Sequence, residues 1–100
     1  MSAVDLIGEL EAALDEYEPG QSNPDAVRTF HSLLKDIEGS ADAPKNLVAE
    51  KTGSIRELVD VLYSPRKHQR RGGVEQVKSF IRQDLSSLRT IIQRGRKRSV

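Results

Sequence analysis

The stretch VEQVKSFIRQDLSSLRTIIQ, residues 74–93, decides the fold class of this 100-residue chain. Apolar residues recur in it every three to four positions, which places them within an arc of about 140° on one face of an α-helix. These residues are Val74, Val77, Phe80, Ile81, Leu85, Leu88, Ile91 and Ile92. A helix with one apolar face needs other elements to cover that face, so the rest of the chain has to supply them.

Two helices are expected in the first part of the chain. The first covers residues 3–17, where apolar residues share one face, and Ser2 with an aspartate three residues later comes close to a capping box. A proline-glycine pair follows it as a stop signal. The second helix begins at Pro24, because proline suits the first turn, and ends at Gly39.

Two short helices are expected in the middle of the chain. One covers residues 44–51, and the other covers residues 54–63, which begin with the capping-box pattern Ser-x-x-Glu. Gly53 separates them as a helix breaker. Apolar residues cover more than half of the circumference of the second helix, so we expect it to be the most buried element.

Residues 47–62 resemble the helix-turn-helix motif of phage repressors. The small Ala49 suits a helix contact, and Gly53 falls four residues later at the turn. The resemblance implies DNA reading by the second helix. The pattern is broken at Thr52 and Ser54, and two of the three polar outward residues of the reading helix are acidic, which repels phosphate. We therefore favour an ordinary helical corner at this place.

The whole pattern predicts an all-α fold. Residues 1–93 are expected to form a single domain, a small antiparallel bundle of four to five helices in which residues 64–73 are an irregular linker. Residues 94–100 are expected to form a flexible basic tail. The predicted core is mostly aliphatic and consists of Leu10, Leu14, Phe30, Leu33, Leu34, Ile37, Leu58, Leu62, Phe80, Ile81, Leu85 and Leu88.

The composition excludes several classes of protein and site. The chain has no cysteine, which excludes disulfides, thiol nucleophiles and cysteine-ligated zinc and fits a reducing compartment. No apolar run approaches the roughly 18–20 residues of a membrane span. The first residues are acidic, unlike the basic start of a signal peptide. We expect an intracellular protein, cytoplasmic, or nuclear if its host is eukaryotic or a virus.

Catalytic motifs are not found in the sequence. It contains no phosphate-binding glycine loop, metalloprotease motif, calcium loop or nucleophile elbow. The histidines His31 and His68 stand apart from each other, so no metal site is expected. We expect neither a cofactor nor an enzymatic activity.

The charge is divided sharply along the chain. Residues 1–63 hold 5 Lys and Arg against 13 Asp and Glu, whereas residues 64–100 hold 11 Lys and Arg against 2 Asp and Glu. This asymmetry predicts that the last third binds nucleic acid or another polyanion. The candidate binding residues are Arg66, Lys67, Arg70, Arg71, Lys78, Arg82, Arg89, Arg94, Arg96, Lys97 and Arg98. The alternative is that acidic and basic parts neutralise each other within one fold or across a dimer.

The basic stripe is the most detailed part of this prediction. We give this name to Lys78, Arg82, Arg89 and Arg96, which project within about 40° of one another along the edge of the apolar face. Such a stripe can follow a phosphate backbone while the apolar side stays in the core. Arginines of this kind also pair with acids of neighbouring helices, and this alternative is open at this point.

Two smaller features also have two interpretations each. Gly72 and Gly73, before the last helix, leave backbone amides for a phosphate or form a flexible hinge, and we favour the hinge. Asp84 projects inside the apolar arc with no cation three or four residues away. It either meets a cation from another helix or subunit or lies in a hydrated gap, and we favour the gap.

The competing hypothesis is a protein-interaction module, that is, a regulator, adaptor or inhibitor. Such a module engages its partner through the acidic first helices or an apolar helix face, and a homodimer through the last helix is one form of it. Binding to a membrane surface ranks third, because the last helix offers only Phe80 as an interfacial aromatic residue.

Overall fold

The chain folds into five helices in the part that the structure describes. The computed structural model describes residues 2–17, 24–41 and 43–98, with only the backbone of residues 65 and 95–98. The helices are α1 (Ala3–Asp15), α2 (Pro24–Ser40), α3 (Lys45–Leu62), α4 (Pro65–Arg70) and α5 (Val74–Arg98). No strand occurs in these residues, so the all-α prediction is confirmed.

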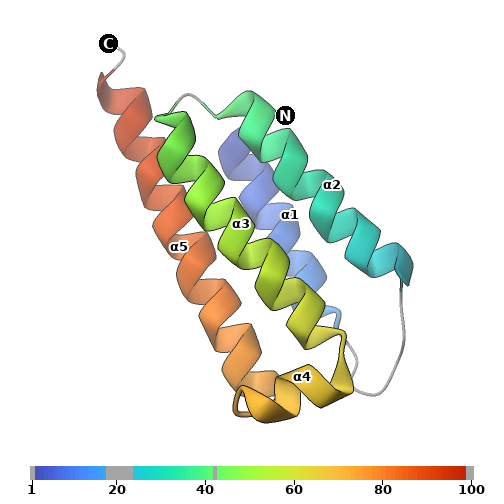
Figure 1. The fold of residues 1–100 in the computed structure, drawn as a ribbon. Coiled ribbons are helices and arrows are strands. Elements are labelled where there is room, and N and C mark those ends of the chain that lie inside the picture. The colour runs from blue at the N-terminus through green and yellow to red at the C-terminus, as the bar shows by residue number, and fades with distance from the viewer. Residues whose placement is uncertain (1, 18–23, 42, 99–100) are drawn as a thin grey trace.

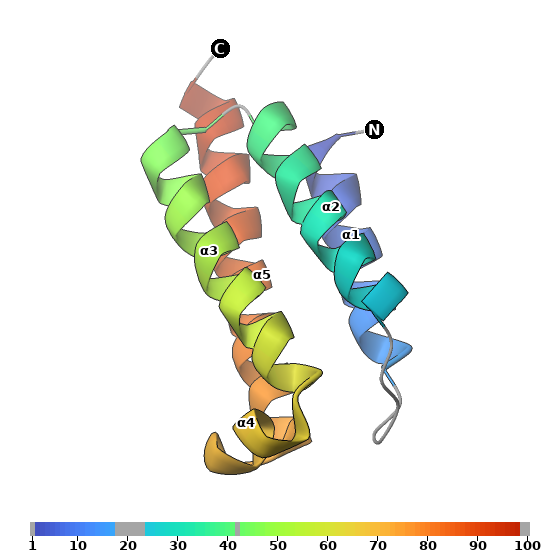
Figure 2. The same ribbon diagram turned by 45° about the vertical axis from the view of Figure 1, so that its right-hand side comes forward.

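The four long helices form an up-and-down bundle (Figures 1 and 2). Helix α1 packs against α2 and α5, and α3 packs against the same two helices from the other side. The short helix α4 lies across one end of the bundle and links α3 to α5. We call this the α4 end. The molecule measures 46 × 23 × 19 Å, and α1 begins and α5 ends at the end opposite to α4.

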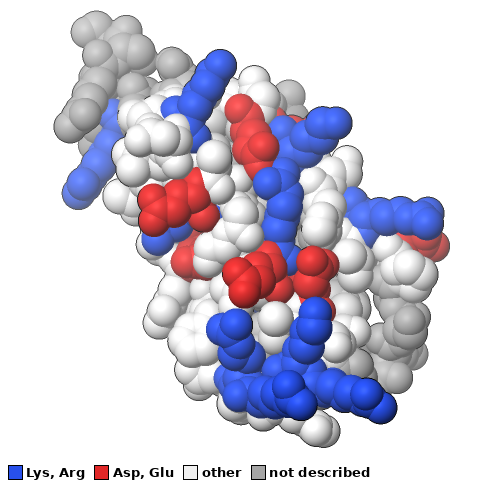
Figure 3. Space-filling model, viewed as in Figure 1, with Lys and Arg blue, Asp and Glu red and all other residues white. Residues whose placement is uncertain are grey.

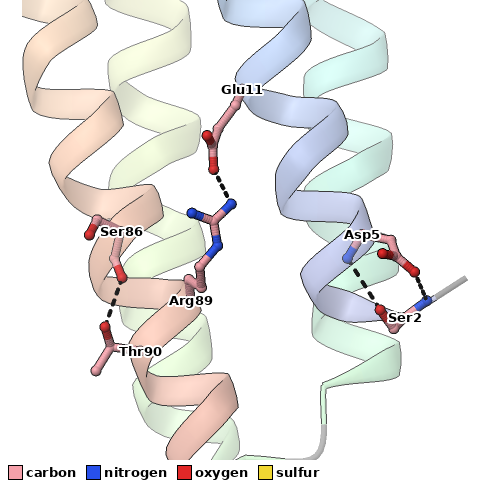
Figure 4. A network of polar contacts seen from close by, with 6 residues as sticks. All are labelled: Ser2, Asp5, Glu11, Ser86, Arg89 and Thr90. Atoms are coloured by element: carbon pink, nitrogen blue, oxygen red, sulfur yellow. Dashed lines mark hydrogen bonds and ion pairs between the residues drawn. The ribbon is translucent and has the colours of Figure 1, made fainter.

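The first helix begins with a complete capping box. The Ser2 hydroxyl accepts the amide hydrogen of Asp5 at 3.2 Å, and the Asp5 carboxylate accepts that of Ser2 at 3.3 Å (Figure 4). These bonds satisfy amides that have no partner within a helix. The helix ends at Asp15, and Glu16 is its C-cap, close to the predicted end.

The core is aliphatic and lies along the axis of the bundle. Its fully buried large side chains are Ile7, Leu10, Leu14, Phe30, Leu34, Ile37, Ile55, Leu62, Ile81, Leu85, Leu88 and Ile92. Most predicted core residues are among them, while Leu33 and Leu58 are partly buried. Phe80 was expected in the core but is 36% exposed. It lies at the edge of the apolar face of α5, beyond the narrow seam that begins with Val77 and Ile81 and faces α1 and α3.

Helix α3 is continuous through Gly53, contrary to the prediction of two short helices. Both the helix-turn-helix and the helical corner are therefore wrong. Glycine costs about 1 kcal/mol in a helix, but burial of one continuous apolar face on both sides of it outweighs that cost. Thr52, which departs from the helix-turn-helix pattern, is fully buried in this face. Its hydroxyl donates to the Ala49 carbonyl at 3.2 Å.

The predicted linker contains helix α4, with Ser64 as N-cap and Pro65 in the first turn. Gly72 and Gly73 end it with φ angles of 94° and 95°, which favour glycine, and the Gly73 amide donates to the His68 carbonyl at 2.7 Å. Helix α5 was expected to end near Gln93 but continues to Arg98. The predicted tail is thus helical in residues 94–98, and residues 99–100 lie outside the described residues.

Membrane-spanning elements were sought in the same residues. Each described helix is too short or too polar to cross a bilayer.

Candidate polyanion-binding surface

The fold separates the predicted basic residues into three groups along the long axis. The first, which we call the α4 cluster, consists of Arg66, Lys67, Arg70 and Arg71. The second consists of Lys78, Arg82 and Arg89, the members of the basic stripe that lie in the first two thirds of α5. The third, from Arg94 to Arg98, lies at the opposite end of the bundle. Figure 3 shows the first group as a dense blue band at the α4 end, with acidic side chains next to it.

The α4 cluster is exposed and mostly unpaired. Arg71 lies 3.5 Å from the Glu57 carboxylate, and both side chains are more than half exposed. Arg66, Lys67 and Arg70 form no ion pair with any side chain that the structure describes. The cluster therefore presents at least three cations that are open to an external anion.

A depression lies between α4 and the end of α3. It has a volume of about 350 Å³ and is lined by Glu57, Asp60, Val61, Lys67, Arg70 and Arg71. The three basic residues project from one face of α4, because they are three and four positions apart. Asp60 is held on the opposite wall by His31 of α2, whose Nε2 lies 3.1 Å from the carboxylate. His31 is thus a partly exposed residue that connects α2 to α3.

Two of the four residues of the basic stripe, in contrast, are paired with carboxylates of α1. The Arg82 guanidinium donates to the Asp15 carboxylate at 3.1 Å, and that of Arg89 donates to Glu11 (Figure 4). These four residues and Ser86 line a cleft of about 160 Å³ between the two helices. Neutralisation within one fold, the alternative left open by the sequence, therefore applies here.

The remaining candidates have different surroundings. Lys78, half-buried, and Arg94, exposed, form no ion pair with the described residues. The side chains of Arg96, Lys97 and Arg98 lie outside what the structure describes, so their part in the predicted surface is still a prediction.

Asp84 has partners on another helix, which corrects the hydrated gap that the sequence favoured. The Ser54 hydroxyl donates to its carboxylate at 2.6 Å, and the Lys51 ammonium lies 4.0 Å away. Only 18% of the Asp84 side chain is exposed. The cation that a buried carboxylate requires thus comes from α3. Sequence spacing within α5 does not reveal this partner.

A second ion pair connects α2 with α3. The Arg56 guanidinium lies 2.5 Å from the Glu38 carboxylate. Burial raises the pKa of Glu38, but hydrogen bonds from Thr52 and Arg56 and the charge of Arg56 outweigh it, so that the pKa lies below its usual value. Arg56 and Glu38 therefore join their helices and are not part of an external binding surface.

Aromatic residues at the α4 end were not recognised as a unit in the sequence. The Tyr17 and Tyr63 rings meet edge to face with centroids 5.0 Å apart, and Phe30 lies 6.2 Å from Tyr63. The Tyr17 hydroxyl donates to the Leu62 carbonyl at 3.2 Å. Burial raises the pKa of both tyrosines, and their proximity raises that of Tyr63 further. These rings pack α1 and α2 onto the end of α3 and are not presented to a ligand.

The glycine pair and the exposed apolar residues give weaker support for a binding site than the basic residues do. The Gly73 amide is already used by His68, so it is not open to a phosphate. Large apolar side chains exposed in the described residues are Leu47 (41%) on α3 and Phe80 (36%) on α5. Two separate side chains do not form the large apolar patch of a protein-binding face, and the interaction-module hypothesis is still a prediction.

Comparison with known proteins adds no relative to this description. No family model, no curated protein and no solved structure matches the chain. Within the described residues, no group of three or more potential metal ligands is found. Any assignment of function therefore rests on the charged surface itself.

Proposed function

We propose that this protein is a non-catalytic module that binds nucleic acid through its backbone phosphates, with the α4 cluster as the main contact. The observation that carries the proposal is the contrast between two basic regions of one molecule. Arg82 and Arg89 are paired with carboxylates of α1, whereas Arg66, Lys67 and Arg70 are exposed without a described carboxylate partner.

The α4 cluster can engage phosphate at little internal cost. The ion pair that it forms with a described residue, between Arg71 and Glu57, is exposed on both sides, and such pairs contribute only about 0–1 kcal/mol. Exchange of the Glu57 carboxylate for a phosphate therefore costs little. Each cation that neutralises a phosphate releases condensed counterions, which supplies the driving force.

Base reading is not part of the proposed mechanism. The tyrosines at this end are packed against each other, and base stacking needs exposed aromatic faces. The short helix α4 presents cations, but with six residues it is too short to place a row of side chains along the base edges in the major groove of DNA. The proposed binding is therefore independent of sequence and controlled by salt.

The test is a titration of the full chain with a fluorescent DNA duplex at several salt concentrations. With three to four phosphates neutralised, the logarithm of the association constant should fall with the logarithm of salt with a slope of about −2.7 to −3.6. A slope near zero, or no binding at low salt, contradicts the proposal. The same titration with RNA and with heparin tells nucleic acids from other polyanions.

A matched pair of variants locates the contact. R66Q/R70Q removes two charges of the α4 cluster and should lower affinity roughly tenfold or more at 0.1 M salt and make the slope shallower by about 2. K35Q/K45Q removes two exposed cations from α2 and α3 and should have a much smaller effect. Equal effects of the two variants mean that net charge, not the α4 cluster, drives binding.

A further inference from the structure

The charged contact between α1 and α5 has a role beyond holding two helices together. We infer that Glu11 and Asp15 restrict polyanion binding to the α4 end, because they neutralise the two arginines that would otherwise extend the binding surface along α5. We call this contact the charge mask. The inference rests on the proposed function and names the residues that determine how far the binding surface extends.

The geometry of the charge mask follows from two antiparallel helices. Arg82 and Arg89 are seven residues apart, about 10 Å along α5, and Asp15 and Glu11 are four residues apart, about 6 Å along α1. Asp15 therefore pairs with the arginine nearer to the α4 end and Glu11 with the other one. Both arginines are thus paired with carboxylates of one helix.

The masked arginines are accessible to solvent. The Arg82 side chain is 49% exposed and the Arg89 side chain 37% exposed, so neither is buried beyond the reach of a phosphate. Lys78, one turn from Arg82 towards the α4 end, forms no ion pair with the described residues. Without the carboxylates, cations would continue from the α4 cluster through Lys78 to Arg89.

Helix α1 cannot move aside to reveal this surface. Leu10 and Leu14, from the same turns of α1 as Glu11 and Asp15, are fully buried, as is Ile7. Separating α1 from α5 exposes several such side chains, each worth about 1.5–3 kcal/mol. The charge mask is thus a fixed property of the folded protein and limits both affinity and footprint.

The inference is tested with E11Q/D15N, which keeps the side-chain shapes and removes both negative charges. The DNA duplex titration should give a slope steeper by about 2 and an affinity raised roughly tenfold or more at 0.1 M salt. The control E9Q/E16Q removes two exposed charges from α1 and its C-cap; neither glutamate forms an ion pair with a described residue. Its affinity should rise less than about threefold and its slope should stay near that of the wild type.

A second pair of variants separates the mask from a general change in charge. R82Q/R89Q should lower the affinity of the wild type by less than R66Q/R70Q does, because these arginines are already paired and their loss leaves only the carboxylates of Glu11 and Asp15 uncompensated. The same substitutions in the E11Q/D15N background should remove the gain. Thermal unfolding followed by circular dichroism confirms that each variant is folded; we expect small changes, because the pairs are exposed.

The outcomes for the two proposals can be told apart. If the wild type binds as expected but E11Q/D15N behaves like E9Q/E16Q, the charge mask is wrong and the proposed function stands. If the wild type does not bind and E11Q/D15N does, the mask is supported and binding by the unaltered α4 cluster is refuted. If neither binds duplex at low salt, both proposals are refuted.

Discussion

At the scale of single residues, Asp84 shows how a charged side chain is accommodated inside an apolar helix face. Its carboxylate accepts the Ser54 hydroxyl and lies near Lys51, so two side chains of α3 compensate for its removal from water. The same contacts fix how α3 and α5 lie along each other, because only one register brings these three residues together.

Ser54→Ala should lower the free energy of unfolding by about 1–3 kcal/mol, since a mostly buried carboxylate loses its donor. Adding Asp84→Leu should recover much of this loss, because an apolar pair at that place leaves no buried carboxylate without a donor, and the Lys51 side chain is one-third exposed to water. Ser40→Ala, whose hydroxyl donates to its own helix at an exposed place, serves as control and should change stability by less than about 0.5 kcal/mol. Urea unfolding measures all three; equal effects of the Ser54 and Ser40 substitutions would contradict the role of Asp84.

The tyrosine pair predicts a loss of stability in alkaline solution. The pKa values of Tyr17 and Tyr63 are raised in the folded protein, so the folded state holds these protons more tightly than the unfolded state. Their contribution is fully present below the unfolded pKa of about 10 and is lost as pH rises through the folded values. Urea unfolding between pH 8 and about 11 should show this decline, and Tyr63→Phe should decline less steeply. Parallel curves for the two proteins would refute the contribution of Tyr63.

At the scale of the elements, apolar periodicity was sufficient to predict α1, α2 and the existence of α5, because each has a clear apolar face. End signals are clear in α1 and α2, whereas α5 continues five residues past its predicted end. It failed at Gly53, where a glycine followed by a capping-box pattern indicates a break. The local preference is worth about 1 kcal/mol, and the packing of α3 against α2 and α5 overrides it. Helix α4 was missed for the related reason that its six residues contain no apolar period to detect.

Two glycine substitutions should therefore have opposite effects on stability. Gly53 lies in the middle of α3 with no heavy atom within 4 Å of an added Cβ, so Gly53→Ala should stabilise the protein by about 0.5–1 kcal/mol. Gly72 has a φ angle of +94°, and an added Cβ would lie 3.0 Å from the Gln76 side chain, so Gly72→Ala should destabilise it by about 1 kcal/mol or more. Midpoints of urea unfolding measure both. Destabilisation by Gly53→Ala would mean that α3 is bent there in solution.

At the scale of the whole molecule, the charge division could be predicted from the sequence, but the pairing of particular arginines with particular acids could not. Arg82 and Arg89 meet acids that lie 67 and 78 residues earlier in the chain, and no local pattern connects them. The α4 cluster could be predicted, because its cations lie within residues 66–71 and have few acids near them in sequence. Whether the residues of the basic stripe are open to a ligand could not be predicted without the position of α1.

The molecule is expected to be a monomer in dilute solution. Its large exposed apolar side chains in the described residues are on different helices, whereas a stable interface needs a contiguous apolar patch. Small-angle X-ray scattering should therefore give a radius of gyration near 13.6 Å that does not change with protein concentration. A clearly larger value that rises with protein concentration would favour the homodimer alternative.

The packed tyrosines also make the molecule its own optical reporter. The chain contains no tryptophan and two tyrosines, and both tyrosines lie at the end of the bundle that carries the α4 cluster. Ultraviolet emission therefore originates at one pole of the molecule. Binding at that pole, for example of a colourless polyanion such as heparin, can be followed by the intensity or lifetime of tyrosine fluorescence without attaching a dye. The pole where α1 begins contributes no tyrosine emission.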